Sequence, residues 1–350
     1  MYGNSFSDLM LLKYGSDVQY IKLVPDQRLT TTLNTNQFLY CMKKIFLLSL
    51  IAFAAGQILL ISCKKKEPEG PPIASIFYSI ANKQVAFTAL TKRADTWNWD
   101  FGDGQTSTEM NPVHIYQEGG IYDVKLTATG NGKSVDATAV VSLALSNMQM
   151  LTGGIKATSG KKWKISSAHS AKDAFALADD QFTPVQAIGT GMLGNVGLGL
   201  GEVYDDIFIF KHDGTYTHSP QHGGAFAGLL YSMLTQQQIL KATAVSQSFG
   251  LCYTAWTPQA ATFTLNEKKD LAITTVSTDG NTPADRTYKS VMTLTFSGAE
   301  FIGFMDFTRE CIVQEITPAK MRLVMFVSTT QKAYYNKPSY VVILTFETVP

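Results

Sequence analysis

The sequence predicts an all-β protein with two β-sandwich domains behind an amino-terminal export signal. Two observations indicate strands. The 350 residues include 20 phenylalanines and 15 tyrosines, and many short segments alternate apolar with polar side chains, as half-buried strands do. The third observation is a charged start followed by an apolar run, which is typical of export. A chain of this length has room for two or three domains.

Charge excludes one class of partner. The formal net charge is +1 and 16% of the residues are charged, so the chain has no broad basic field for a polyanion. We therefore expect no nucleic-acid partner.

Residues 42–62 have the three parts of a secretory signal. Lys43 and Lys44 form a positive start, and an apolar run over residues 45–61 follows. The run is shorter than the ~20 residues that a membrane-spanning helix needs. A cleaved signal is therefore expected, ending in a small residue, Ser62.

The end of this signal, Leu60-Ile61-Ser62-Cys63, resembles the lipobox of bacterial lipoproteins. The resemblance implies cleavage after Ser62 and acylation of Cys63, with palmitate among the acyl chains. Several acyl chains anchor a protein stably, since each buried methylene contributes roughly 0.8 kcal/mol. The alternative is an uncleaved signal anchor with a chance cysteine.

The residues around the signal carry less information. Residues 1–41 show no clear periodicity, and we interpret them as a gene-start error upstream of Met42; a cytoplasmic extension is the alternative. Residues 63–72 contain KKKEPEGPP, whose Lys, Glu, Pro and Gly predict a tether. The expected location is the cell envelope, at the outer membrane. Surface-exported lipoproteins of some glycan-using bacteria carry acids directly after the cysteine, whereas lysines come first here, so periplasmic and surface-facing orientations both stay open.

Residues 73–146 predict the first, smaller sandwich. Trp97 and Trp99 lie two positions apart and so share one face of a strand. Asp103-Gly104 is a strong hairpin-turn signal. In IYDVKLTAT, residues 121–129, apolar and polar side chains alternate as in a half-buried strand.

The stretch WNWDFGDG, residues 97–104, places two carboxylates among glycines. We interpret Asp100 and Asp103 as turn residues whose oxygens accept hydrogen bonds from their own loop. A calcium site is the sharper alternative, but a third or fourth acidic ligand is lacking nearby. A phosphate cradle would need a helix after the glycines, and a strand follows here.

Three ordered motifs in this region resemble the PKD domain family. They are Trp97-x-Trp99-Asp100-Phe101-Gly102-Asp103-Gly104, Asn111-Pro112-x-His114-x-Tyr116 and Gly120-x-Tyr122-x-Val124. The resemblance covers about a fifth of the chain. It implies an immunoglobulin-like β-sandwich that serves as a spacer or interaction module in extracellular proteins, without catalysis.

Residues 147–350 predict a larger, jelly-roll-like β-sandwich with one inserted helix. VYDDIFIFKHDGTYTHS, residues 203–219, is the clearest hairpin, and at least eight strands follow one another with short polar turns. Apolar residues near helical spacing predict the helix over residues 224–244. The glycine-rich residues 189–202 are expected to form a mobile loop.

Three stretches of this domain resemble the carboxy-terminal domains of lipoproteins from glycan-using Gram-negative bacteria. They are KKWKISSA, YDDIFIFKHDGTYTH and FIGF…CIVQEITPAKMRLVMF. The resemblance implies a carbohydrate-binding or surface accessory sandwich and is looser than the first. It bears on fold more than on ligand.

Two cysteines remain in this domain, Cys252 and Cys311. An even remainder in an oxidising compartment permits one disulfide between them. Two separate buried thiols are the alternative.

Catalytic and metal sites find little support. His218-x-x-x-His222 has a spacing seen in zinc sites on helices, but Pro220 and the following glycines predict a loop, so we expect solvated loop histidines, including His212, and no metal.

The adjacent Asp205 and Asp206 point to opposite faces of a strand and do not form a hydrolytic pair; Asp213 belongs to a turn. Neither Gly-x-Ser-x-Gly nor His-Glu-x-x-His occurs. We expect no catalytic residue and no cofactor.

Aromatic side chains are the candidate ligand-binding residues, because an exposed ring stacks on the apolar face of a sugar. We select Trp256, Tyr253 and Trp163 as candidates; Tyr334 and Tyr335 lie in another loop. For each, a core or edge position is the alternative.

These observations predict a lipid-anchored exported protein that binds a polysaccharide or another cell-surface component without catalysis. The first alternative is a structural lipoprotein that interacts with an envelope protein. The second is a glycoside hydrolase. An exposed aromatic platform would favour polysaccharide binding, and a large apolar patch would favour the structural lipoprotein. Two facing carboxylates about 5–10 Å apart in a cleft would favour the glycoside hydrolase.

Overall fold

The computed structural model describes residues 70–350 except 196–197, 244–249 and 331–332. The expected signal, the lipidation at Cys63, most of the tether and residues 1–41 lie outside the described residues. Within the described part, no helix is long and apolar enough to cross a bilayer.

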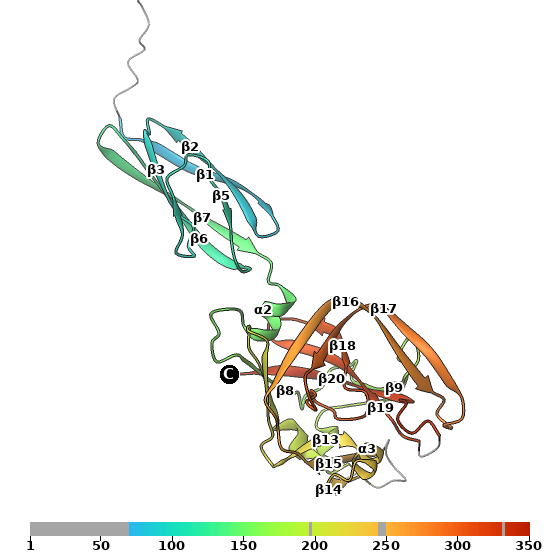
Figure 1. Ribbon diagram of the computed structural model, residues 1–350. Coiled ribbons are helices and arrows are strands. Elements are labelled where there is room, and N and C mark those ends of the chain that lie inside the picture. The colour runs from blue at the N-terminus through green and yellow to red at the C-terminus, as the bar shows by residue number, and fades with distance from the viewer. Residues whose placement is uncertain (1–69, 196–197, 244–249, 331–332) are drawn as a thin grey trace, which may run out of the picture. The chain divides into compact units, whose positions relative to one another are not determined.

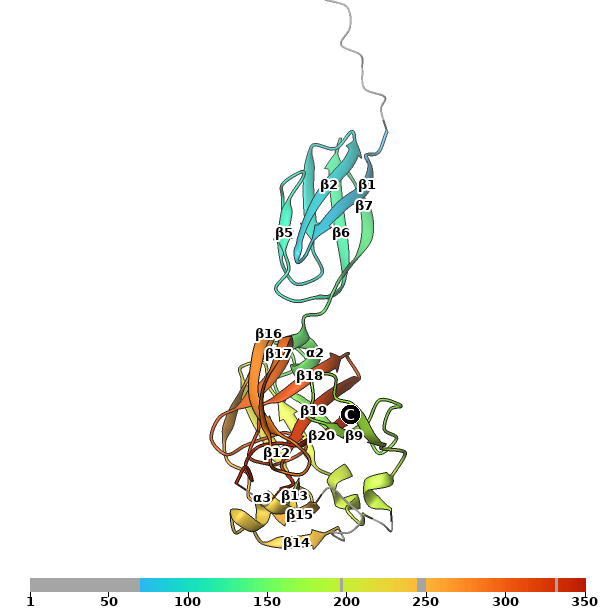
Figure 2. The same cartoon turned by 90° about the vertical axis from the view of Figure 1, so that its right-hand side faces the viewer.

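The first domain is a β-sandwich of two antiparallel sheets (Figures 1 and 2). One sheet has the order β1-β2-β5 and the other β4-β3-β6-β7. The strands are β1 (Ile73–Ala81), β2 (Gln84–Lys92), β3 (Thr96–Asp100), β4 (Thr106–Ser107), β5 (Val113–Ile115), β6 (Gly120–Gly130) and β7 (Lys133–Leu143). The alternation expected along residues 121–129 appears in β6, where Val124 and Leu126 are buried between exposed neighbours.

Aromatic rings fill the core of this sandwich. Trp99 is fully buried, and its ring lies 5.3 Å from that of Phe87 on the opposite sheet. The Trp99 Nε1–H donates to the carbonyl of Glu109 at 2.9 Å, so its one polar atom is satisfied. Trp97, on the same face, is half-buried and donates to Thr91 Oγ1.

The two carboxylates of WNWDFGDG make turn hydrogen bonds, as expected. Asp100 Oδ1 accepts from the amide of Gly102 at 2.9 Å, and Asp103 Oδ1 accepts from the amide of Gln105 at 3.0 Å. The second Asp103 oxygen pairs with His114 Nε2 at 2.7 Å. Gly102 has a φ of 78°, and a Cβ there would lie 2.7 Å from the backbone oxygen of Asp123 on β6. Among the described residues, no group of three or more potential ligands is arranged to hold a metal.

A short helix starts the second domain. In α2 (Asn147–Thr152) a complete capping box joins Ser146 and Gln149. The carbonyl of Leu151, near its end, accepts a 2.9 Å hydrogen bond from Trp163 Nε1.

The second domain is built on a ten-stranded antiparallel sheet that closes on itself. Its order is β10-β9-β20-β19-β18-β17-β16-β12-β11-β8, and β8 also pairs with β20, so all but β9 and β10 form a ring. The ring strands are β8 (Lys161–Ile165), β11 (Ile207–Phe210), β12 (Thr215–Ser219), β16 (Ala261–Val276), β17 (Pro283–Phe296), β18 (Cys311–Ile316), β19 (Lys320–Val327) and β20 (Tyr340–Val349); outside it lie β9 (Ala174–Leu177) and β10 (Pro184–Ala187). The all-β prediction is confirmed; in detail, a barrel-like ring replaces the two sheets of a jelly roll.

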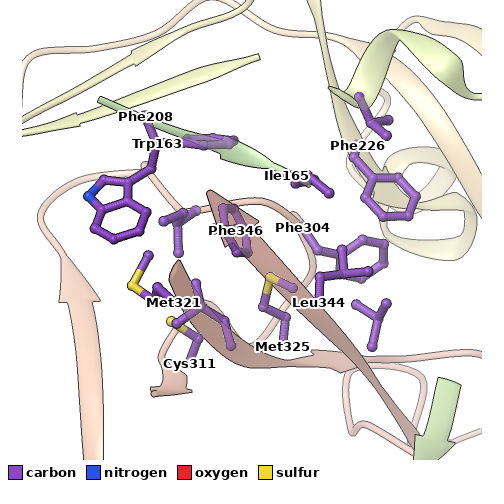
Figure 3. Packing of buried hydrophobic residues seen from close by; sticks show 14 of the residues in the cluster. Trp163, Ile165, Phe208, Phe226, Phe304, Cys311, Met321, Met325, Leu344 and Phe346 are labelled. Atoms are coloured by element: carbon purple, nitrogen blue, oxygen red, sulfur yellow. The ribbon is translucent and has the colours of Figure 1, made fainter. Parts of the chain in front are cut away.

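The ring encloses the main hydrophobic core. Figure 3 shows Trp163, Phe208, Phe346 and Met325 packed together inside it. Phe208 and Phe210 both point inward, two positions apart on β11, as the strand alternation predicts.

The expected helix over residues 224–244 forms only in part. Three elements occupy this range: β13 (Gly224–Gly228), α3 (Leu229–Leu234) and β14 (Ile239–Ala242), and β13 and β14 flank β15 (Leu251–Ala255) in a separate sheet. Every residue of β13 is buried, so its apolar run has no alternation to distinguish it from a helix. A Cβ on Gly224 would lie 2.6 Å from Tyr253 Cε1, which shows how closely the strands approach.

In the glycine-rich stretch, the described residues 189–195 and 198–202 contribute side chains to the core, in contrast to the expected mobile loop. This region contains the short turns η1 (Met192–Gly194) and η2 (Gly201–Tyr204). The side chains of Leu193 and Leu200 are fully buried in the barrel core.

The expected disulfide is not formed. Cys252 and Cys311 are both free and buried. They lie in different sheets, Cys252 on β15 beside Ser232 Oγ and Cys311 on β18 in the barrel wall. Burial raises the pKa of both thiols, to about 11 and about 12, so both remain protonated at neutral pH.

Removing the Asp103 carboxylate is expected to destabilise the first domain. The substitution Asp103→Ala deletes the bond to Gln105 and leaves His114 without its partner, a loss of about 1–3 kcal/mol. Hydrogen exchange of β5 and β6 amides in full-length protein would measure it. Asp136→Ala, which removes an exposed pair with Lys125 and an exposed hydrogen bond from Thr127 Oγ1, is the control. Equal exchange in both variants would contradict this account.

The stability of the second domain is expected to fall as pH rises from 4 to 7. Asp306 is fully buried, and burial raises its pKa from 3.8 to about 7. Between pH 4 and pH 7 the unfolded chain releases the Asp306 proton, whereas the folded chain keeps it. The free energy of unfolding therefore falls by at most about 4 kcal/mol over this range, and it levels off above pH 7. Urea midpoints at pH 4, 5.5 and 7.5 would measure it. Asp306→Asn should flatten the profile; an unchanged slope in that variant would assign the effect elsewhere.

Candidate functional site

The three aromatic candidates have different positions. Trp163 is fully buried in the barrel core, with its indole nitrogen bonded to Leu151, so it is a core residue and the expectation of a ligand contact is wrong. Tyr253 lies on β15 with 2% of its surface exposed. Trp256 follows β15 and is half-buried. An exposed tryptophan platform is therefore absent from the described part of the second domain.

The three histidines of the second domain also differ in their surroundings. His222 is exposed on a loop and pairs with Asp205 at 2.8 Å. His212 lies 3.5 Å from Thr152 Oγ1. His218, in contrast, is buried on β12, where Tyr216 and His218 both face inward. The expectation of a solvated loop histidine is wrong for His218, because β12 extends to Ser219 before the loop begins.

His218 lies between two buried carboxylates. Its Nε2 is 3.8 Å from Asp206 Oδ2, and its Nδ1 is 3.9 Å from Glu300 Oε2. Both distances exceed hydrogen-bonding range. The other oxygen of each acid accepts from a backbone amide: Asp206 from Gln221 at 3.2 Å and Glu300 from Gln259 at 2.7 Å. These amides fix the carboxylates while one oxygen of each remains directed at the imidazole.

Aromatic rings surround this arrangement. Phe208 stacks on His218 with a centroid distance of 4.8 Å, and Phe301 meets it edge-on at 5.3 Å. Trp256 also meets Phe301 edge-on, with a centroid distance of 5.4 Å. Burial is the main cause that raises the pKa of Asp206 above its ordinary value.

Tyr253 and Glu202 belong to the same region. Burial is the largest cause that raises the pKa of the Tyr253 phenol. The negative charges of Asp206 and Glu202 raise it further, and that of Asp206 has the larger effect. Strand register places Tyr253 and Glu202 together as well: Tyr253 on β15 pairs with Lys241 on β14, and Lys241 forms an ion pair with Glu202. We call Glu202, Asp206, His218, Tyr253, Trp256 and Glu300 the polar cluster.

The polar cluster concentrates unsatisfied atoms. In the described residues, eight buried side-chain nitrogen or oxygen atoms have no hydrogen-bond partner, and six of them belong to this cluster. They are Glu202 Oε2, His218 Nδ1, His218 Nε2, Tyr253 Oη, Trp256 Nε1 and Glu300 Oε2. Buried polar atoms are almost always paired, so a local concentration of exceptions calls for a functional explanation.

Exposed ion pairs form the rim of the polar cluster. His222 and Asp205 pair with about half of each side chain accessible. Glu202 pairs with Lys241, whose side chain is 51% exposed. The cluster thus extends from the solvent-exposed rim to the buried His218.

A second hydrogen-bond chain holds the segment that carries Asp205 and Asp206. Asp173 Oδ2 bonds to His169 Nδ1 at 2.9 Å, and His169 Nε2 bonds to Tyr204 Oη at 2.7 Å. Burial opposes ionisation of Asp173, but hydrogen bonds from His169, Ser170 and Thr345 lower its pKa overall. Since Tyr204 directly precedes the two aspartates, this chain positions the polar cluster.

Comparison with known proteins bears on the first domain. Residues 70–144 match the family model described as PKD domain. Collagenase ColA of Bacillus cereus is 39% identical over 56 residues, which are 15% of this chain and 6% of the collagenase. The chain thus spans a small part of that relative.

Solved structures give a similar result. The PKD1 domain of Vibrio anguillarum Epp is 27% identical, with a TM-score of 0.21, and covers 22% of this chain and 98% of that domain. A carbohydrate-binding module from the β-sandwich superfamily is 13% identical, with a TM-score of 0.23, and covers 80% of this chain and 92% of that module. At these scores the superpositions carry no argument about the second domain. By its motifs and the family match, the region of residues 70–144 is a PKD domain.

Proposed function

We propose that this chain is an exported, lipid-anchored protein that binds carbohydrate without catalysing a reaction. In this proposal the PKD domain is a spacer and the carboxy-terminal domain holds the ligand. The described part of the second domain lacks an exposed tryptophan platform, so the observation that carries the proposal is the polar cluster, where free hydrogen-bonding atoms lie among aromatic rings. Sugars combine hydroxyl groups with apolar faces, so they match both components.

The arrangement of charges supports binding over hydrolysis. A glycoside hydrolase places two carboxylates on either side of the bond it cleaves. Here the free oxygens of Asp206 and Glu300 face opposite edges of one imidazole, so His218 occupies the space between them.

The second candidate function is protein interaction at the cell envelope. One observation favours it: the outer face of the β1-β2-β5 sheet exposes a row of large apolar side chains. These are Ile73, Phe77, Leu90, Val113 and Ile115. Such a face is typical of a surface that meets another protein.

Carbohydrate binding is expected to depend on Trp256. Full-length protein in detergent would be run in native gels that contain starch, glucomannan or galactomannan, while released reducing sugar is monitored. We expect retardation by at least one polymer, without sugar release, and at least a fivefold weaker effect for Trp256→Ala. The control is Tyr335→Ala, since Tyr335 is an exposed aromatic residue of the same domain that contacts Phe307 and does not belong to the polar cluster. Retardation lost equally in both variants, or sugar release, would contradict the proposal; no retardation by any polymer would favour protein interaction.

Anchoring is expected to depend on Cys63. Cells grown with radioactive palmitate should label the wild-type chain, and Cys63→Ser should abolish the label because the lipid is attached through the sulfur of Cys63. Cys41→Ser is the matched control and should remain labelled. Label that persists in Cys63→Ser would exclude the proposed anchor.

A further inference from the structure

We infer that the polar cluster selects uncharged, hydroxyl-rich sugars and rejects anionic ones, with Asp206 and Glu300 as the residues that determine this specificity. The inference rests on the proposed carbohydrate binding and adds the chemical class of the ligand. Two independent observations lead to it: the charge left over in the cluster and the types of its free atoms.

Counting charges leaves the cluster negative. Lys241 pairs with Glu202, and His222 pairs with the neighbouring Asp205 at the rim. The remaining two carboxylates, Asp206 and Glu300, have only the imidazole of His218 between them. Burial raises the pKa of Asp206, but one negative charge remains in excess whether a single shared proton lies on Asp206 or on His218. An entering carboxylate or sulfate would be repelled, and the repulsion is strong because the site is buried.

The free atoms also require a ligand that both donates and accepts. Glu202 Oε2 and Glu300 Oε2 accept when ionised, whereas Trp256 Nε1 only donates. Tyr253 and His218 offer either role. A hydroxyl group donates to the carboxylates and accepts from the indole, so it satisfies every type of atom in the cluster. A carboxylate or sulfate can only accept, and it would leave the glutamates unpaired.

Exposure falls from the rim of the polar cluster toward its inner end. Trp256 is half-buried, and the rim pairs are partly exposed, whereas His218 and Glu300 lie at the buried end. We therefore expect the end of a glycan chain or a side branch to enter past Trp256 and reach toward Glu300.

A variant that lacks one unpaired atom distinguishes a role of that atom in ligand binding from a role in folding. Tyr253→Phe deletes one unpaired buried hydroxyl, which should leave folding unharmed because that hydroxyl has no partner within hydrogen-bonding distance among the described residues. If the hydroxyl binds ligand, the same change weakens binding. Thr293→Val is the matched control, since it deletes an unpaired buried hydroxyl on β17 that is not part of the cluster.

The experiment compares each neutral polymer with its own anionic derivative. Starch, glucomannan and galactomannan would be used native and after oxidation of their primary C6 hydroxyls to carboxylates, with full-length wild type, Tyr253→Phe, Glu300→Gln and Thr293→Val. We expect the oxidised polymer to bind the wild type at least tenfold more weakly. Glu300→Gln should reduce this ratio to threefold or less, Tyr253→Phe should weaken neutral binding at least threefold, and Thr293→Val should match the wild type. Thermal unfolding of each variant establishes that it is folded.

The outcomes separate this inference from the proposed function. Binding of native and oxidised polymers with equal strength, or binding by a folded Tyr253→Phe variant equal to that of the wild type, would overturn the selectivity and leave carbohydrate binding intact. Failure of every polymer to bind would overturn both.

Discussion

The pairing of β20 with both β8 and β9 is the constraint on which the second domain depends. The first half of β20 pairs with β9 and the second half with β8, while β19 covers its other edge. Without the β8 contact the sheet would have two open edges and an unenclosed core. Trp163 and Phe346 reach that core from the two strands that close the ring. The closure also fixes Asp173, because Thr345 on β20 donates to it from both its amide and its hydroxyl.

The polar cluster is the part of the domain that packing does not explain. An apolar side chain at the position of His218 would fit between Phe208 and Phe301 without leaving buried polar atoms unpaired. The protein instead places an imidazole and two carboxylates there, and each acid is fixed by a backbone amide. Residues that oppose stability in this way are commonly retained for function, and a ligand that pairs with them would recover the loss.

Local signals were predictable, and long-range ones were not. The turn hydrogen bonds that Asp100 and Asp103 accept come from amides two residues further on, so the sequence of the loop is sufficient to predict them. Aromatic type and a position near a loop make Tyr253 and Trp256 candidate binding residues, but they do not report the neighbours of these side chains. The partners of His218 depend on strand register, because five strands lie between His218 and Glu300 in the sequence, and no local pattern reports their contact. The inward alternation of Tyr216 and His218 was a usable signal, but Pro220 and the following glycines favoured a loop. Cys252 and Cys311 show the same limit: their number permits a disulfide, yet their sheets keep them apart.

The ring closure also governs how the domain can fold. Ser166 and Glu347, whose side chains bond next to the β8–β20 pairing, are 181 residues apart in sequence. Closing so large a loop has an entropic penalty that must be met before the contact forms, and topologies rich in such contacts fold slowly. The barrel therefore cannot close until the segment of β20 has emerged from the ribosome or from an export channel. Until then, the edges of β8 and β19 stay open to pairing with other chains, so assistance by a chaperone would be of most use during that interval.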